Sequence, residues 1–211
     1  MRAVELEAVT IDAYGTLVVL RDPVPRLRET LAGRGVERTG DEVRRAFEAE
    51  VAYYVARSHE GRDEATLARL RRDCAGVFLE AAGAALNAGD FAPAFLDALA
   101  FEELPGAAAA CRSLAAAGLR LAVVSNWDTG LHEHLAALGL DRLVDTIVTS
   151  AEAGAPKPAP AVFELALERL GTSAALTVHV GDSHADSEGA RVAGLRFEPA
   201  PLADAARRIL A

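Results

Sequence analysis

Short apolar runs alternate with longer amphipathic segments along most of this chain. Five runs rich in Val, Ile, Leu or Thr predict buried strands, at 8–12, 119–124, 145–149, 176–180 and 195–198. Segments with helical periodicity lie between them, and a glycine follows each, at 107–117, 131–138, 160–170 and 187–193. Strands that alternate with helices predict right-handed crossovers, and therefore an α/β fold with a parallel sheet and helices on both faces.

One long stretch interrupts this alternation. Between residues 21 and 104 no segment has the character of a strand, and three apolar stripes at helical spacing run through 42–57, 67–78 and 91–99. We therefore expect an all-helical insertion, a cap, between the first two strands of the α/β core. The predicted division is a core of residues 1–17 and 105–211 and a helical cap of residues 18–104.

Composition and charge narrow the choice of partners. The 211 residues are 51% hydrophobic and 25% charged, as in an ordinary globular protein, and the net charge is −9. An acidic chain lacks the broad positive surface that nucleic acid or anionic lipid would need. The apolar character of the predicted cap helices leaves both a monomer and a homodimer open.

The predicted location is cytoplasmic. The N-terminal residues lack the apolar stretch of a secretory signal, and no window is long and apolar enough to cross a membrane. The two cysteines, Cys74 and Cys111, lie in apolar helical patterns, so we expect buried thiols and a reducing compartment.

Polar residues follow the predicted strands. Asp12 ends the first run, Ser125 and Asn126 follow the second, and Asp182 follows the fourth. Lys157, the only lysine of the chain, lies between two prolines after the third run. Ligands of open parallel sheets bind beyond the carboxyl ends of the strands, so we expect these side chains to meet at one edge.

The polar residues that follow the predicted strands have the chemistry to bind a cation and an anion at the same site. Asp12, Asp182 and Asp186 would repel one another without a cation, and oxygen ligands of this kind suit Mg²⁺. Helix capping would explain one of the two later acids, not both. The Ser125 hydroxyl and nearby backbone amides can hold anionic oxygens.

Taken together, these residues resemble the four motifs of the haloacid dehalogenase superfamily of hydrolases. IDAYGTL resembles the first motif, Ser125-Asn126 the second, Lys157-Pro158 the third and GDSHAD, residues 181–186, the fourth. The helical stretch occupies the position of the C1 cap of that family. The resemblance implies a Rossmann-like core, hydrolase activity and Asp12 as a nucleophile that forms a covalent aspartyl intermediate.

The resemblance also implies roles for the remaining residues. Mg²⁺ would be held by Asp12, Asp182 and the backbone carbonyl of Tyr14, with Asp186 close by or bound through water. Lys157 and Ser125 would act in catalysis on the phosphoryl group. The substrate-binding set is expected to comprise Tyr14, Thr16 and Asn126. The implied activity is a Mg²⁺-dependent phosphatase acting on a small phosphorylated metabolite.

One departure from the family pattern leaves alternatives open. Phosphatases of the family carry a second Asp two residues after the nucleophile as general acid and base, and Tyr14 stands there in this chain. The DAYGT sequence resembles the metal-independent 2-haloacid dehalogenases of the same family, whose halide leaving group needs no proton. Asp182 argues against that activity, because those enzymes lack its counterpart. A slow phosphatase, a dehalogenase and a non-catalytic protein that binds a ligand or a partner all remain hypotheses.

Overall fold

The computed structural model describes residues 6–211, so the first five residues of the predicted core lie outside the described part. The chain forms two compact units. The core unit comprises the residues up to Val19 together with Glu102–Ala211, and the helical unit comprises Leu20–Phe101. Within residues 6–211, every helix is too short or too polar to cross a bilayer.

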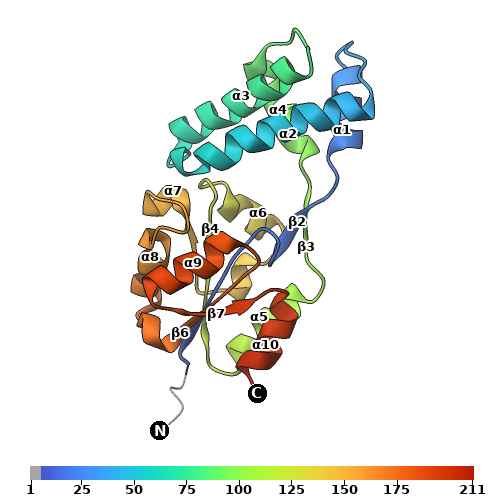
Figure 1. Ribbon diagram of the computed structural model, residues 1–211. Coiled ribbons are helices and arrows are strands. Elements are labelled where there is room, and N and C mark those ends of the chain that lie inside the picture. Colours follow the sequence, from blue (N-terminus) through green and yellow to red (C-terminus); the bar gives the residue numbers. More distant parts are fainter. Residues whose placement is uncertain (1–5) are drawn as a thin grey trace. The chain divides into compact units, whose positions relative to one another are not determined.

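A five-stranded sheet in the order β5-β4-β1-β6-β7 forms the centre of the core unit, and all its neighbouring strands are parallel (Figure 1). The predicted parallel α/β fold is confirmed. The central strand β1 is buried along its whole length, as expected for a parallel strand covered on both faces. The strands are β1 (Ala8–Ile11), β4 (Arg120–Ser125), β5 (Thr146–Thr149), β6 (Thr177–Gly181) and β7 (Arg196–Pro199).

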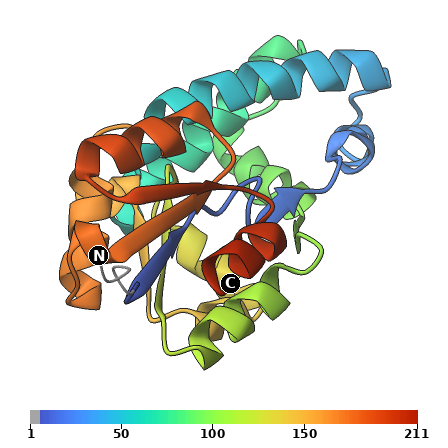
Figure 2. The ribbon, with the colours of Figure 1, turned by 60° about the horizontal axis from the view of Figure 1, so that its bottom comes forward.

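Helices cover both faces of this sheet (Figure 2). On one face α8 packs against β4 and β5, and α9 packs against β6 and β7; α5 and α10 contact each other and the other face. The helices of the core unit are α5 (Ala107–Ala116), α6 (Leu131–Ala137), α7 (Ser150–Ala153), α8 (Ala161–Leu170), α9 (His184–Ala193) and α10 (Leu202–Ile209). Short 3₁₀ turns η2 (Asp141–Leu143) and η3 (Ala174–Leu176) precede β5 and β6.

Two short strands occur where the chain passes between the units. Strands β2 (Val18–Leu20) and β3 (Phe101–Glu103) pair as a two-stranded sheet. The expectation that no strand lies between residues 21 and 104 is therefore wrong for β3. Three residues are too few to show a periodic pattern, so the pairing depends on the partner strand.

The helical unit is built around an aromatic cluster. The buried rings of Phe78, Phe91 and Phe95 lie with centroids 5.1–6.3 Å apart. The free thiol of Cys74 is buried in this unit, and that of Cys111 is buried in the core unit, as predicted. The helices of this unit are α1 (Val24–Ala32), α2 (Gly40–Arg57), η1 (Ser58–Glu60), α3 (Glu64–Ala81) and α4 (Ala88–Ala98).

The buried face of α2 differs from the apolar stripe in the sequence. Val51 and Val55 belong to that stripe but are exposed, whereas Val43, Ala46 and Glu50 are buried. The helix thus buries a carboxyl group in place of two valines. Burial raises the pKa of Glu50 to about 7, although a hydrogen bond from the Cys74 thiol opposes this change.

Candidate active site

The strand ends bring Asp12 and Ser125 together. Asp12 follows β1 directly, and its backbone N–H donates to the carbonyl of Val180 on β6 at 2.8 Å. Ser125 is the last residue of β4, which lies on the other side of β1, and its hydroxyl donates to Asp12 Oδ1 at 3.3 Å. The predicted convergence of these two side chains is therefore present, and both are buried.

Lys157 completes this group from the loop between α7 and α8. Its buried ammonium donates to Asp12 Oδ1 at 2.6 Å, to Asp186 Oδ1 at 2.6 Å and to the Val124 carbonyl at 2.9 Å. Although burial opposes its charge, Asp12 and Asp186 raise the pKa of Lys157. All three ammonium hydrogens thus have acceptors.

Asn126 holds the backbone on which Lys157 is placed. Its side-chain oxygen accepts from the Lys157 N–H at 2.6 Å, and its amide nitrogen donates to the Lys157 carbonyl at 3.0 Å. This two-way clamp fixes the lysine loop against the end of β4. Because the side chain is engaged in this way, a contact of Asn126 with substrate, which stays a prediction, would come from its backbone N–H.

Asp186 is bound on both oxygens. Oδ1 accepts from Lys157 and from His179 Nε2 at 3.0 Å, and Oδ2 accepts from the Ser183 hydroxyl and from the Ser183 N–H at 3.0 Å. Ser183 and Asp186 form a capping box that begins α9 at His184, earlier than the predicted start at residue 187. Although burial opposes its charge, the hydrogen bond from His179 and the charge of Lys157 hold the pKa of Asp186 well below its usual range.

Three carboxylates form a candidate cation site. Asp12, Asp182 and Asp186 each offer an oxygen within 4.8 Å of the others. Burial, followed by the charge of Asp186, raises the pKa of Asp182. Burial also raises the pKa of Asp12 to about 6, and Asp186 and Asp182 add to this while Lys157 opposes it. Acids crowded in this way favour a cation, and an all-oxygen donor set fits Mg²⁺.

Asp182 differs from the other two acids because it is exposed. A hydrogen bond from its own backbone N–H opposes the rise in the pKa of Asp182, and the exposure of the side chain leaves its other acceptor positions open to a ligand. Gly15 lies against this carboxylate with a left-handed φ of 86°, and a Cβ there would be 2.1 Å from Asp182 Oδ2. Only glycine permits so close an approach of this loop.

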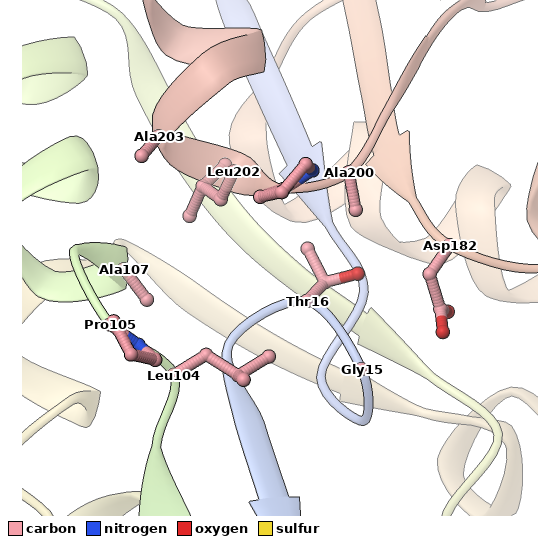
Figure 3. A pocket seen from close by; sticks show the side chains of 10 residues that line it. Gly15, Thr16, Leu104, Pro105, Ala107, Asp182, Ala200, Leu202 and Ala203 are labelled. Carbon is pink, nitrogen blue, oxygen red and sulfur yellow. The ribbon is translucent and has the colours of Figure 1, made fainter.

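The neighbours of Gly15 face different surroundings. Tyr14 is half exposed, whereas Thr16 is buried and its hydroxyl has no hydrogen-bond partner among the described residues. Figure 3 shows Gly15, Thr16 and Asp182 at the wall of a cavity of about 450 Å³. The predicted contact of Thr16 with substrate would need this hydroxyl to become accessible. The other lining residues are Leu104, Pro105, Ala107, Ala200, Pro201, Leu202 and Ala203.

Sequence reasoning did not find two members of the site. His179 is fully buried in β6, and one of its partners is the site residue Asp186. Ser183 is the N-cap that orients Asp186. The available signals were a histidine inside an apolar strand that ends at the fourth motif, and a serine three residues before an acid.

Comparison with known proteins gives the family. The sequence pattern of the haloacid dehalogenase-like hydrolases matches residues 6–194. Haloacid dehalogenase-like hydrolase domain-containing protein 3 of Mus musculus is 38% identical over 102 residues, which is 48% of this chain and 41% of the mouse protein. The chain therefore spans less than half the length of that relative.

Two further matches cover most of the chain. A phosphoglycolate phosphatase of Rhodospirillum rubrum is 33% identical over 205 residues, covering 90% of this chain and 77% of that protein. The crystal structure of a defluorinating L-2-haloacid dehalogenase has the same fold, with a TM-score of 0.75 at 19% identity over 98% of this chain and 96% of that one. The chain belongs to the haloacid dehalogenase-like hydrolases.

Proposed function

We propose that this hydrolase is a Mg²⁺-dependent phosphatase that acts on a small phosphorylated metabolite through an aspartyl-phosphate at Asp12. The observation that carries the proposal is the position of Asp12. Its Oδ1 lies 2.6 Å from Nζ of the only lysine, and the residue offers a carboxylate oxygen within 4.8 Å of those of Asp182 and Asp186. The similarity to a protein named phosphoglycolate phosphatase supports a phosphate ester as the substrate class.

The cation would be held by Asp12 and Asp182 together with the backbone carbonyl of Tyr14. When bound, Mg²⁺ would neutralise the repulsion between the carboxylates and an incoming phosphoryl group. We assign Asp186 beside the cation rather than on it, because four donors already occupy its two oxygens. Its role would be to hold the Lys157 ammonium in place.

The chain's own residues would carry the two chemical steps. A carboxylate oxygen of Asp12 attacks phosphorus while the bond to the leaving oxygen breaks, and the departing alkoxide takes a proton from water. A water molecule then attacks the phosphorus of the acyl phosphate, which releases inorganic phosphate and restores the Asp12 carboxylate. Lys157 and Ser125 would bind phosphoryl oxygens, exchanging their present bonds to Asp12 for bonds to substrate. Positioning and charge stabilisation would supply most of the acceleration.

Residues 18–104 are proposed to act as a cap that excludes water during the reaction, as in the C1-capped hydrolases that this chain resembles. A cytoplasmic location and a monomer or homodimer complete the proposal. The net charge of −9 supports a small-molecule substrate rather than nucleic acid or a membrane surface.

The residue at position 14, Tyr14, favours a second candidate function, that of a 2-haloacid dehalogenase. A neutral phenol is a poor substitute for the carboxylic acid that protonates a leaving alkoxide, whereas a halide needs no proton. A metal-independent 2-haloacid dehalogenase would therefore tolerate Tyr14. We favour the phosphatase because Asp182 presents an exposed carboxylate that a metal-independent reaction would not need.

The test is hydrolysis of p-nitrophenyl phosphate with Mg²⁺ and with chelator. We expect Mg²⁺-dependent turnover that is lost in Asp12→Asn, falls in Asp182→Asn and is unchanged in Asp97→Asn, a control at an exposed acid on α4. Halide release from a 2-haloacid in the presence of chelator would instead establish the dehalogenase. If neither activity is present and a phosphorylated ligand only raises the melting temperature, the chain is a binding protein.

A further inference from the structure

We propose that His179 is a positioning residue for this site, which orients Asp186 and, through it, Lys157. Its effect on turnover rests on the proposed phosphatase function. Its effect on the geometry of Lys157 does not, and it can be measured separately.

The hydrogen bonds of His179 fix which nitrogen faces the site. His179 is fully buried in β6 and lies in register with Thr10 on β1. Its Nε2 is 3.0 Å from Asp186 Oδ1, and its Nδ1 is 2.9 Å from Thr10 Oγ1 and 3.1 Å from the Thr10 carbonyl. An ionised carboxylate only accepts, so the hydrogen lies on Nε2 and points to Asp186. In the neutral imidazole Nδ1 is then an acceptor, and the Thr10 hydroxyl donates to it. The Thr10 carbonyl also only accepts, so its contact with Nδ1 is not a hydrogen bond in this tautomer.

Aromatic packing holds the imidazole plane. The ring of Phe163 on α8 meets the His179 ring edge-on, with centroids 4.9 Å apart and planes at 86°. Phe163 approaches closely because α9 has a glycine opposite it: a Cβ on Gly189 would be 2.6 Å from the Phe163 ring. The imidazole is thus fixed by a hydroxyl at one nitrogen, a carboxylate at the other and a phenyl edge.

His179 is linked to the proposed nucleophile Asp12 through Asp186 and Lys157. Asp186 Oδ1 accepts from both His179 and Lys157, and Lys157 also donates to Asp12. In a buried network each bond polarises the next, so the position of one member depends on the others. Without the Nε2 donor, Asp186 Oδ1 would keep only Lys157, and the carboxylate could turn and draw the ammonium away from Asp12.

The experiment uses His179→Phe and His179→Gln, because glutamine keeps an N–H donor and an acceptor. The full chain labelled with ¹³C-lysine gives a single side-chain ε-carbon signal, because Lys157 is the only lysine. We expect His179→Phe to shift this signal and His179→Gln to restore it. On p-nitrophenyl phosphate, His179→Phe should lower kcat about 10- to 100-fold with KM nearly unchanged, and glutamine should recover most of the loss.

A second pair of variants covers the case in which His179→Phe does not fold. Thr10→Val removes the hydroxyl and keeps the side-chain shape, and should shift the lysine signal, whereas Thr10→Ser should not. Thr177→Val is the matched control: Thr177 is a buried threonine at the start of β6, with its hydroxyl bonded to the Ser173 carbonyl. That variant should lose stability without moving the signal.

The outcomes separate the two claims. If wild-type protein has no phosphatase activity but the lysine signal follows this pattern, the proposed function fails and the positioning role stands. If the signal and kcat of folded His179→Phe equal those of wild type, the positioning role is refuted. If the His179 variants do not fold but the Thr10 variants do, the positioning role is refuted when Thr10→Val gives the same lysine signal as wild type.

Discussion

Replacing Gly15 with alanine separates two physical effects at the candidate cation site. The first is backbone strain: φ at Gly15 is 86°, and an L-residue in the left-handed region loses roughly 1–2 kcal/mol. The second is collision, because the new Cβ would lie 2.1 Å from Asp182 Oδ2. The Asp182 side chain is exposed and can turn aside, so we expect the collision to weaken cation binding rather than folding.

Gly118 provides the matched control. Its φ is also 86°, but a Cβ there would meet nothing within 4 Å. Gly118→Ala and Gly15→Ala should therefore lose a similar free energy of unfolding, about 1–2 kcal/mol, in urea titrations at 25 °C. Only Gly15→Ala should raise the Mg²⁺ concentration needed for half-maximal hydrolysis of p-nitrophenyl phosphate. We expect a rise of about tenfold, which corresponds to about 1.4 kcal/mol.

Two outcomes of this comparison between Gly15→Ala and Gly118→Ala would contradict the prediction. If the two alanine variants show the same Mg²⁺ dependence, Gly15 is not needed to make room for Asp182, and the assignment of that carboxylate to the cation loses its structural support. If Gly15→Ala loses far more stability than Gly118→Ala, Asp182 cannot turn aside and the division into two effects is wrong.

Three further predictions concern single side chains. Tyr14→Asp should restore a general acid and raise the hydrolysis of alkyl phosphates by about 10²-fold, with a smaller gain on p-nitrophenyl phosphate, whose leaving group needs no proton. Lys157→Met should lower the free energy of unfolding by about 3–5 kcal/mol in metal-free urea titrations at pH 7, because it leaves Asp12 and Asp186 buried without their shared cation. Glu50→Gln should flatten the pH dependence of stability: the pKa of Glu50 is raised from 4.5 to about 7, so the folded state loses about 3 kcal/mol as pH rises from 4.5 through 7, and glutamine removes that loss.

Each of these has its own contrary outcome. Equal gains on alkyl and aryl phosphates for Tyr14→Asp would show that the new carboxylate does not protonate the leaving group. If Lys157→Met lowers the free energy of unfolding by less than about 1 kcal/mol, the ion pairs of Lys157 stabilise the fold no more than exposed ion pairs do. If stability falls equally between pH 4.5 and 8 in Glu50→Gln and wild type, another group titrates there.

The strands of the core could be predicted from the sequence because parallel strands are buried on both faces. Their continuous apolar runs mark them without help from alternation, and all five predicted runs lie within one residue of the observed strands. Strand β3 could not be found this way, because three residues carry no period. Glu50 was missed for a related reason: the apolar stripe of α2 does not coincide with the face that the neighbouring helices bury.

The meeting of Asp12, Ser125, Lys157 and Asp186 could be predicted because parallel strands deliver their carboxyl ends to one edge. The hydrogen-bond partners could not be predicted. That Asn126 clamps the lysine backbone, or that His179 faces Asp186, depends on side-chain orientations that no spacing encodes. Sequence patterns locate the site, and packing decides which atoms touch.

The burial of the only lysine has a practical consequence. A reagent that acylates amines finds one side-chain amine in this chain, and that amine is enclosed by two carboxylates and a carbonyl. The rate at which Lys157 is acylated, measured by mass spectrometry, therefore reports how often this part of the molecule opens and exposes the amine. Small molecules that bind at the site and keep it closed should slow the acylation of Lys157. A screen for slower acylation can therefore search for the natural substrate of the protein without an assay of turnover.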